Sequence, residues 1–189
     1  MALLSKMLAD WRHSLISDYI RGDVLDIGCG NSIILQKFGD QINSYCGVEL
    51  STKRFADLKK KFPQANFIAR DLDNDALEID QQFDLIVMIA IVEHIWNQKF
   101  LIEQLVRLLT SDGKIIITTP TPFGNDIVHT AGAKIGLFAK SAVDDHVVIY
   151  NRRRFENLAN EFDLTILEYK RFQFFCNQFV VLGKNAAEK

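Results

Sequence analysis

The stretch VLDIGCGNS, residues 24–32, begins as a hydrophobic strand and ends in two glycines, a cysteine and polar residues. Asp26 lies inside the apolar run, where a carboxylate costs free energy unless a partner satisfies it. Gly28 and Gly30 let the backbone approach a ligand at a place where a Cβ atom would block it. The stretch therefore predicts a strand that ends in a ligand-binding turn, with a negative charge kept beside it.

Length and composition favour one soluble globular domain over residues 1–189. The chain is 48% hydrophobic and 24% charged, which is typical of such domains. Its net charge of −2 gives no whole-surface attraction to nucleic acid or to anionic lipid. The basic stretches KRFADLKKKF and NRRRF are interpreted as solvated helix faces, so no nucleic-acid partner is predicted.

The first twenty residues predict an amphipathic helix that packs one face on the body of the domain. The apolar positions at helical spacing are Leu4, Leu8, Trp11, Leu15 and Tyr19. Membrane docking of this face is the alternative. Residues 1–20 lack the pattern of a secretory signal, and the apolar run at 85–92 is far shorter than the roughly 20 residues that cross a bilayer. We expect no stable membrane insertion.

The cysteines suit a reducing compartment. Cys29, Cys46 and Cys176 are odd in number and form no CxxC pair, so neither a disulfide framework nor a zinc site is indicated. A cytoplasmic location is expected. The oligomeric state is not indicated by any feature of the sequence.

Strands and helices alternate after the first strand. Further strands are predicted at NSYCGVEL (43–50), ANFIARDL (65–72), FDLIVMIAI (83–91) and KIIITTP (114–120), with helices at 51–62 and 98–109. This alternation predicts a parallel, doubly wound α/β sheet. A helix capped by Asn151 and an antiparallel strand pair, LTILEYKRF and FFCNQFVVLGK, close the chain, and the phenylalanines of this pair are expected to pack in the core and hairpin.

The ends of the first three strands carry residues suited to a nucleoside. Ligands of doubly wound sheets bind beyond the carboxyl ends of the strands. The glycine turn ends the first strand, Glu49 ends the second and can accept hydrogen bonds from ribose hydroxyls, and Asp71 ends the third and can meet an adenine amine. The simpler alternatives are a turn-capping Asp26, a solvated Glu49 and an Asp71 that belongs only to an acidic loop with Asp73.

Two cofactor classes compete for this site. The dinucleotide fingerprint requires a third glycine, but Ile33 occupies that position. An NAD(P)-dependent reductase is also disfavoured because Tyr150 is followed by Arg154 where a Tyr-x-x-x-Lys pair would place lysine. A carboxylate at Asp26 suits a cofactor that carries an ammonium and a sulfonium better than one with a pyrophosphate.

The successive motifs VLDIGCGNS, GVELS, ARDLDN, FDLIVMIAIVEHI and LLTSDGKIIITTP resemble those of class I S-adenosylmethionine-dependent methyltransferases across residues 22–120. The resemblance implies a Rossmann-like, seven-stranded sheet of order 3-2-1-4-5-7-6 with the last strand antiparallel. It also implies S-adenosylmethionine as the cofactor and a variable, substrate-side segment over residues 121–150.

The same resemblance implies the residues that hold the methionine end of the cofactor. Asp26, Gly28 and Gly30 would line that end, with Cys29 contributing its backbone. Ile89 would offer backbone near the amino-acid portion.

The adenosine end is implied in the same way. Glu49 would bind the ribose, Leu50 would pack on the adenine, and Asp71 would meet the adenine amine with Leu72 beside it. Ser32 stands where the family often has a third glycine, and we expect binding to tolerate this small residue.

Methyl transfer to a hydroxyl needs a proton acceptor, and histidine titrates near neutrality. His94 follows the fourth predicted strand and His146 follows the variable segment, so both are catalytic candidates, with structural roles as the alternative. Some relatives that methylate quinone-pathway phenols place a metal-binding glutamate three residues before a Glu-His pair. Ala90 stands there, and Glu93 with His94 alone is a poor metal site, so no metal is predicted.

These observations predict methyl transfer to a small-molecule oxygen or nitrogen acceptor. The closing segment is similar to that of family members from surface-saccharide and lipid pathways. A non-catalytic module that binds the cofactor is the alternative function.

Overall fold

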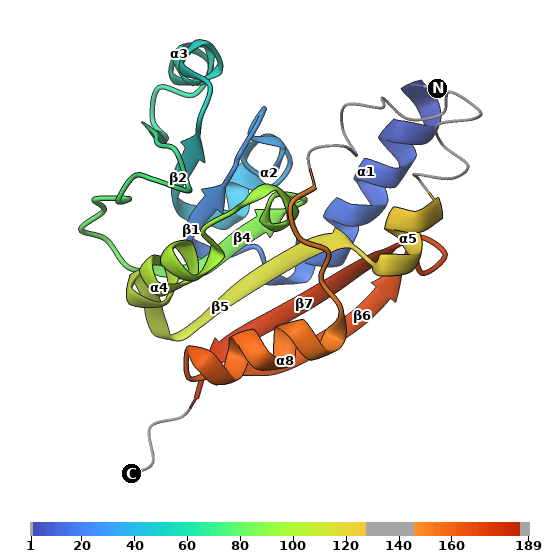
Figure 1. The fold of residues 1–189 in the computed structure, drawn as a ribbon. Helices are drawn as coiled ribbons and strands as arrows, with labels where there is room; N and C mark the ends of the chain where they lie inside the picture. The colour runs from blue at the N-terminus through green and yellow to red at the C-terminus, as the bar shows by residue number, and fades with distance from the viewer. Residues whose placement is uncertain (1, 128–145, 186–189) are drawn as a thin grey trace.

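The computed structural model describes residues 2–127 and 146–185, and its centre is one seven-stranded sheet (Figure 1). The strands are β1 (Gly22–Ile27), β2 (Ile42–Glu49), β3 (Asn66–Ala69), β4 (Phe83–Ile89), β5 (Leu109–Pro120), β6 (Leu164–Phe172) and β7 (Asn177–Lys184). Their order is β3-β2-β1-β4-β5-β7-β6. β7 runs antiparallel to both β5 and β6, and the other pairings are parallel. The predicted fold class, strand order and antiparallel last strand are confirmed.

Helices cover both faces of the sheet. They are α1 (Ala2–Ile16), α2 (Ile33–Phe38), α3 (Thr52–Lys61), α4 (Gln98–Leu108), α5 (Pro122–Ile127) and α8 (Arg152–Glu161), with short 3-10 turns η1 (Ser17–Tyr19), η2 (Gly39–Gln41) and η3 (Val92–His94). The Ser51 and Asn151 side chains cap α3 and α8 by accepting hydrogen bonds from backbone N–H groups in the first turn of each helix. The Asn151 cap lies where the sequence predicted it, and Ser51 lies at the predicted start of its helix.

The core has two layers, one on each face of the sheet. Leu101 of α4 and Phe155 of α8 are fully buried in one layer, and these two helices lie together in front of the sheet in Figure 1. The other layer holds Ile16 of α1, Ile34 of α2 and Leu58 of α3. Residues 85–88 of β4 are all buried, as expected for a central parallel strand covered on both faces.

Two local features differ from the sequence prediction. β5 begins at Leu109 rather than at 114, because its pairing with β4 jumps from Phe83↔Leu109 to Leu85↔Lys114 and the intervening residues remain in the strand. Phe172 and Phe179 are buried as expected, whereas Phe174 and Phe175 are 82% and 64% exposed, so neither of these two belongs to the core, although Phe174 meets Trp11 at the hairpin. The reason is the turn between β6 and β7, where residues 173–175 have positive φ and direct these two rings outward.

Helix α1 confirms the predicted N-terminal helix. Trp11 meets Phe172 and Phe174 edge-on, with ring centroids 6.5 and 6.2 Å apart, so α1 packs beside the β6–β7 hairpin. In the described parts of the chain, no helix combines the length and the apolar character that a bilayer crossing requires. Residues 128–145 of the predicted variable segment lie outside the described residues.

Candidate cofactor and acceptor site

A cavity of about 700 Å³ opens at the carboxyl ends of four neighbouring strands. Its lining comes from the segments that follow β1, β2, β3 and β4: Gly28, Gly30, Glu49, Leu50, Arg54, Asp71, Leu72, Asp73, Ile91, His94 and Ile95. β1 lies between β2 and β4, so the cavity stands at the switch point where doubly wound sheets bind ligands. Six of the predicted cofactor residues, together with His94, are among its walls.

The turn after β1 needs glycine for two separate reasons. Gly28 has φ +67°, and a Cβ atom there would lie 2.7 Å from Cγ1 of Ile91. Gly30 has φ +56°, but its added Cβ would meet nothing closer than 3.9 Å. The Cys29 amide donates to the Val48 carbonyl at 2.9 Å, which folds the turn back toward β2. The predicted ligand-binding turn thus has one sterically closed glycine and one open to the cavity.

Glu49 is held in place by three donors. Its Oε2 atom accepts from the Gly30 amide at 3.1 Å, and its Oε1 atom accepts from the Ser51 amide at 2.9 Å and from Arg54 Nη1 at 3.0 Å. The residue is only 6% exposed. A carboxylate offers about four acceptor positions, so one position on Oε2 is left for a ligand hydroxyl. Arg54 was not predicted from the sequence. Its side chain is 47% exposed, so it can move away and free a further acceptor position on Oε1 of Glu49.

Asp26 lies behind the turn and is absent from the cavity lining. It is 4% exposed and accepts a hydrogen bond from the Tyr45 hydroxyl at 2.7 Å. Burial raises the pKa of its carboxyl to about 7; the charge of Glu49 acts in the same direction and the Tyr45 hydrogen bond acts against it. Asp26 can therefore change its protonation when a cation arrives nearby.

Two other predicted residues also lie outside the lining. Cys29 is buried, and burial raises the pKa of its thiol to about 12, so the thiol stays protonated. Ile89 is the last residue of β4, and Ile91 rather than Ile89 reaches the cavity. Cys29 and Ile89 can meet a ligand only indirectly or through backbone.

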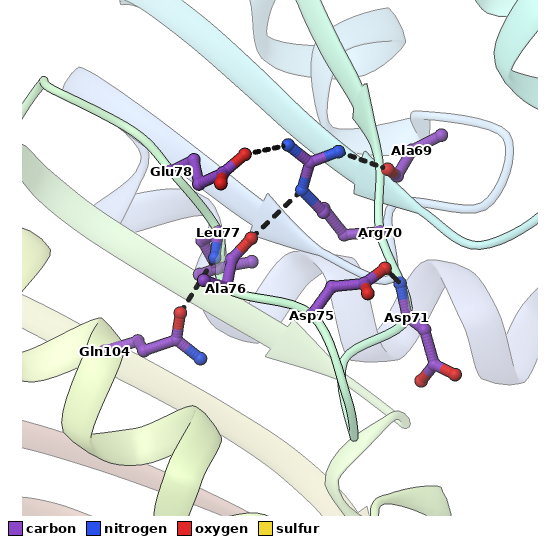
Figure 2. Close-up of polar contacts among 8 residues, drawn as sticks. All are labelled: Ala69, Arg70, Asp71, Asp75, Ala76, Leu77, Glu78 and Gln104. Carbon is purple, nitrogen blue, oxygen red and sulfur yellow. Dashed lines mark hydrogen bonds and ion pairs between the residues drawn. The ribbon is translucent and has the colours of Figure 1, made fainter.

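The loop after β3 is closed by its own polar contacts (Figure 2). Asp71 accepts from the Asp73 amide at 3.0 Å and from Asn74 Nδ2 at 2.9 Å, and these bonds lower the pKa of its carboxyl. Its own amide donates to Asp75 Oδ2 at 2.9 Å. Asp71 is thus both a member of an acidic loop and a wall of the cavity.

Arg70 and Gln104 fix the chain that follows this loop. In Figure 2, Arg70 Nε donates to the Ala76 carbonyl at 3.0 Å and Arg70 Nη2 contacts Glu78 at 2.5 Å, while Gln104 accepts from the Leu77 amide at 2.8 Å. The Asp71 carboxylate points away from this network. The Arg70 contacts therefore hold the loop in place without using the Asp71 carboxylate, which lies on the opposite side of the loop.

The structure brings both candidate histidines together. The His94 and His146 ring centroids are 5.0 Å apart, although the two residues are distant in the sequence. His146 Nδ1 lies 3.0 Å from Asn125 Oδ1, on α5. Glu93, which sequence reasoning considered only as a metal ligand, is 1% exposed, and its carboxyl pKa is raised by burial. The amides of Val147 and Val148 donate to the Glu93 carbonyl at 2.8 and 3.3 Å, which brings His146 to η3.

Comparison with known sequences identifies the family. The sequence profile of the methyltransferase domain matches residues 5–169, which is most of the chain. The chain belongs to the methyltransferase-domain family. The resemblance to class I S-adenosylmethionine-dependent methyltransferases is thereby confirmed, and the cofactor of this methyltransferase domain is S-adenosylmethionine.

The methyltransferase domain is also similar to curated proteins over part of their length. Nodulation protein S of Azorhizobium caulinodans is 28% identical over 102 residues, covering 52% of this chain and 49% of that protein. The "probable S-adenosylmethionine-dependent methyltransferase" of Mycolicibacterium smegmatis is 24% identical over 98 residues, covering 52% of this chain and 38% of that protein. The match spans less than half the length of either relative.

Solved structures share the fold at low identity. A S-adenosylmethionine-dependent methyltransferase from Clostridium acetobutylicum superposes with a TM-score of 0.69 at 13% identity, covering 88% of this chain and 85% of that one. The magnesium protoporphyrin IX methyltransferase of Synechocystis PCC 6803, crystallised with bound SAH, gives 0.68 at 15% identity, covering 95% and 83%.

The walls of the cavity fit the cofactor of this methyltransferase family. Glu49 keeps an acceptor position for a ribose hydroxyl, and the exposed Leu50 side chain offers apolar surface to a flat base. The open side of Gly30 leaves room for backbone contact. Sequence reasoning missed Arg54, Ile91 and Ile95, although the Ser51 cap could have pointed to Arg54, one turn along α3.

Proposed function

We propose that this methyltransferase domain transfers the methyl group of S-adenosylmethionine to an oxygen or nitrogen atom of a small-molecule acceptor. The observation that carries the proposal is the arrangement of one cavity, with Glu49 and Asp71 on one part of its wall and His94 on another. A nucleoside cofactor and a proton acceptor can therefore share the same space.

The adenosine part would bind along β2 and β3. Glu49 would accept hydrogen bonds from the ribose hydroxyls through its free Oε2 position, with Arg54 and the Ser51 amide fixing its orientation. Leu50, 67% exposed on the wall, would cover the adenine, with Leu72 and Asp71 at its edge.

The methionine part would bind over the glycine turn. Gly28 and Gly30 would give their backbone, and Asp26 would act from behind the turn through its charge rather than by lining the cavity. A ligand ammonium would favour the ionised form of Asp26 and so lower its pKa from about 7.

The cofactor supplies an electrophilic methyl on a sulfonium, and the protein aligns the acceptor with it and excludes water. Alignment of this kind can supply roughly 7–11 kcal/mol of barrier reduction at most. The contact of His146 Nδ1 with Asn125 Oδ1 orients the imidazole ring. His94, on the cavity wall, or His146 behind it would receive the proton of an acceptor hydroxyl.

The acceptor would approach from the side of α1 and α5. Trp11 of α1 and Phe123 of α5 are 38% and 56% exposed and would offer apolar surface to such an acceptor. The solved neighbour from Synechocystis is named for a small-molecule acceptor, which is compatible with this class. A role in surface-saccharide or lipid metabolism is the narrower proposal. The free cysteines, two of them buried, support a reducing, cytoplasmic compartment.

A non-catalytic module that senses S-adenosylmethionine is the second candidate function. It would need the same Glu49 and glycine turn but no proton acceptor beside the methyl group. The meeting of His94 with His146 favours the enzyme over this alternative.

One experiment tests the function directly. The protein is incubated with S-adenosylmethionine carrying a labelled methyl group and with a cell extract, and the molecules that gain the label are identified by mass. Label on a small molecule supports the proposal, whereas cofactor binding without transfer favours the sensor. A parallel titration that shows tight NADH binding and no response to S-adenosylmethionine would overturn both.

A further inference from the structure

Three side chains that bind transition metals meet beside the cofactor cavity. Glu93, His94 and His146 each offer one ligand atom, and these atoms all lie within 4.8 Å of one another. Two atoms that bind one ion at about 2.0–2.2 Å are at most roughly 4.4 Å apart. For three atoms around one ion the limit is tighter, about 3.8 Å in a planar arrangement, so each ligand atom must move by roughly half an ångström through side-chain rotation to reach one ion.

One oxygen of the carboxylate in this cluster has no hydrogen-bond partner among the described residues. Glu93 is 1% exposed, and its Oε2 atom has no hydrogen-bond partner in residues 2–127 and 146–185. A buried carboxylate oxygen without a hydrogen-bond partner is costly, and a cation at Oε2 would lower that cost. Arg12 acts on Glu93 electrostatically, and its Nε atom is also unpartnered, so the arginine does not satisfy the carboxylate by a direct hydrogen bond from Nε.

The imidazole of His146 is oriented as metal-binding imidazoles are. Its Nδ1 atom is 3.0 Å from Asn125 Oδ1, and this contact orients the ring. Metal-binding histidines usually make such a bond with the ring nitrogen that does not bind the ion, and the outer partner tunes affinity. Asn125 lies on α5, so the outer partner comes from a different element than the ligands.

We propose that Glu93, His94 and His146 form a site for a divalent first-row transition metal ion, open toward the cofactor cavity. Two imidazoles and one carboxylate are a ligand set that such ions accept with further positions left open. The prediction of no metal rested on Glu93 and His94 alone, and the fold adds His146 as the third ligand.

The catalytic consequence rests on the proposed function. An acceptor hydroxyl bound at an open position of the ion would lose its proton more readily. The two imidazoles would then be ligands, and the ion would perform the task otherwise given to a free base. The binding of the ion itself is independent of methyl transfer and can be tested alone.

Cobalt(II) is a suitable probe because its visible absorption reports protein ligands. Chelator-treated protein without S-adenosylmethionine is titrated with Co²⁺ and followed by absorption and calorimetry. We expect one equivalent to bind, with affinity at least tenfold lower in Glu93→Gln and in His146→Ala. Asn125→Ala keeps all three ligands and should lower the affinity for Co²⁺ by about 10–100-fold. Arg12→Met removes a positive charge near Glu93 and should strengthen binding.

Glu103→Gln, on the exposed side of α4, is the matched control for Glu93→Gln and should bind Co²⁺ like the unaltered protein. His146→Gln is the second variant if His146→Ala does not fold. No binding at 1 mM Co²⁺, or equal affinity in the Glu93 and His146 variants, overturns the proposal. Titration of the same samples with S-adenosylmethionine separates the two claims: cofactor binding without cobalt binding defeats only this inference, and the reverse defeats only the proposed function.

Discussion

The Glu49 carboxylate accepts a hydrogen bond from the Gly30 amide at 3.1 Å, which joins the end of the second strand to the turn that ends the first. The bond runs between two walls of one cavity. It orients Glu49 before any ligand arrives, so a ribose bound as proposed would meet an acceptor that is already in place.

Glu49→Ala should weaken S-adenosylmethionine binding. Loss of a charged acceptor for the ribose hydroxyls costs about 1–3 kcal/mol, or roughly 5–150-fold in the dissociation constant. Isothermal titration calorimetry measures this directly. Arg54→Ala is the control: it removes the ion pair with Glu49 but leaves the carboxylate, so its effect should be much smaller. Equal affinity in Glu49→Ala and the unaltered protein would remove Glu49 from the site.

Gly28→Ala and Gly30→Ala should have different consequences. Both substitutions place a residue with a Cβ atom in the left-handed backbone conformation, which lowers the free energy of unfolding by about 1–2 kcal/mol. Only Gly28→Ala also drives that atom into Ile91, so its free energy of unfolding should fall by about 1–3 kcal/mol more. Gly30→Ala should keep more stability but lose cofactor affinity. Urea denaturation and calorimetry test the pair, and equal loss of stability in both would contradict the geometry.

Asp26→Asn should flatten the pH dependence of stability. The folded pKa of Asp26 is raised to about 7, so the folded state holds this proton more tightly than the unfolded chain. The contribution of Asp26 to the free energy of unfolding is fully present below about pH 4, the ordinary pKa range of an aspartate. It is lost as the pH rises through about 7, the folded pKa. Asparagine cannot ionise, so the variant should gain stability relative to the unaltered protein from pH 5 to 8. Urea denaturation at four pH values measures the difference, and parallel curves would contradict the raised pKa.

Leu50→Ala should reduce cofactor affinity without changing stability. Leu50 is 67% exposed on the cavity wall, so its removal creates no cavity in the core. Loss of apolar cover over the adenine should cost about 1 kcal/mol, or roughly fivefold in affinity. Leu167→Ala, also an exposed leucine but on β6, is the matched control and should bind S-adenosylmethionine unchanged. Equal losses in both variants would show that the effect is not local to the cavity.

Much of the fold was predictable because local signals agreed with one another. Several elements can be located from their own residues alone. Examples are the buried run of β4, the caps at Ser51 and Asn151, and the glycines after β1. The start of β5 was not predictable, since it depends on the register with β4. Phe174 escaped prediction because the backbone of the hairpin turn, not its hydrophobicity, decides where the ring points.

The position of the cavity was predictable from the rule that the carboxyl ends of parallel strands meet at one edge of the sheet. That rule placed Glu49 and Asp71 on its walls but could not say that Asp26 lies behind them. The meeting of Glu93, His94 and His146 could not be predicted, because it depends on where the chain returns after residue 145. The sequence alone carried no signal for that path.

The two bonds from Val147 and Val148 to the Glu93 carbonyl tether the returning chain at the edge of the cavity. In the proposed function, residues 121–150 face the acceptor, so substitutions there would alter which acceptor binds while these two bonds keep His146 beside η3. Under that proposal, the choice of acceptor could change without moving the histidines, and one backbone arrangement could serve chemically different acceptors.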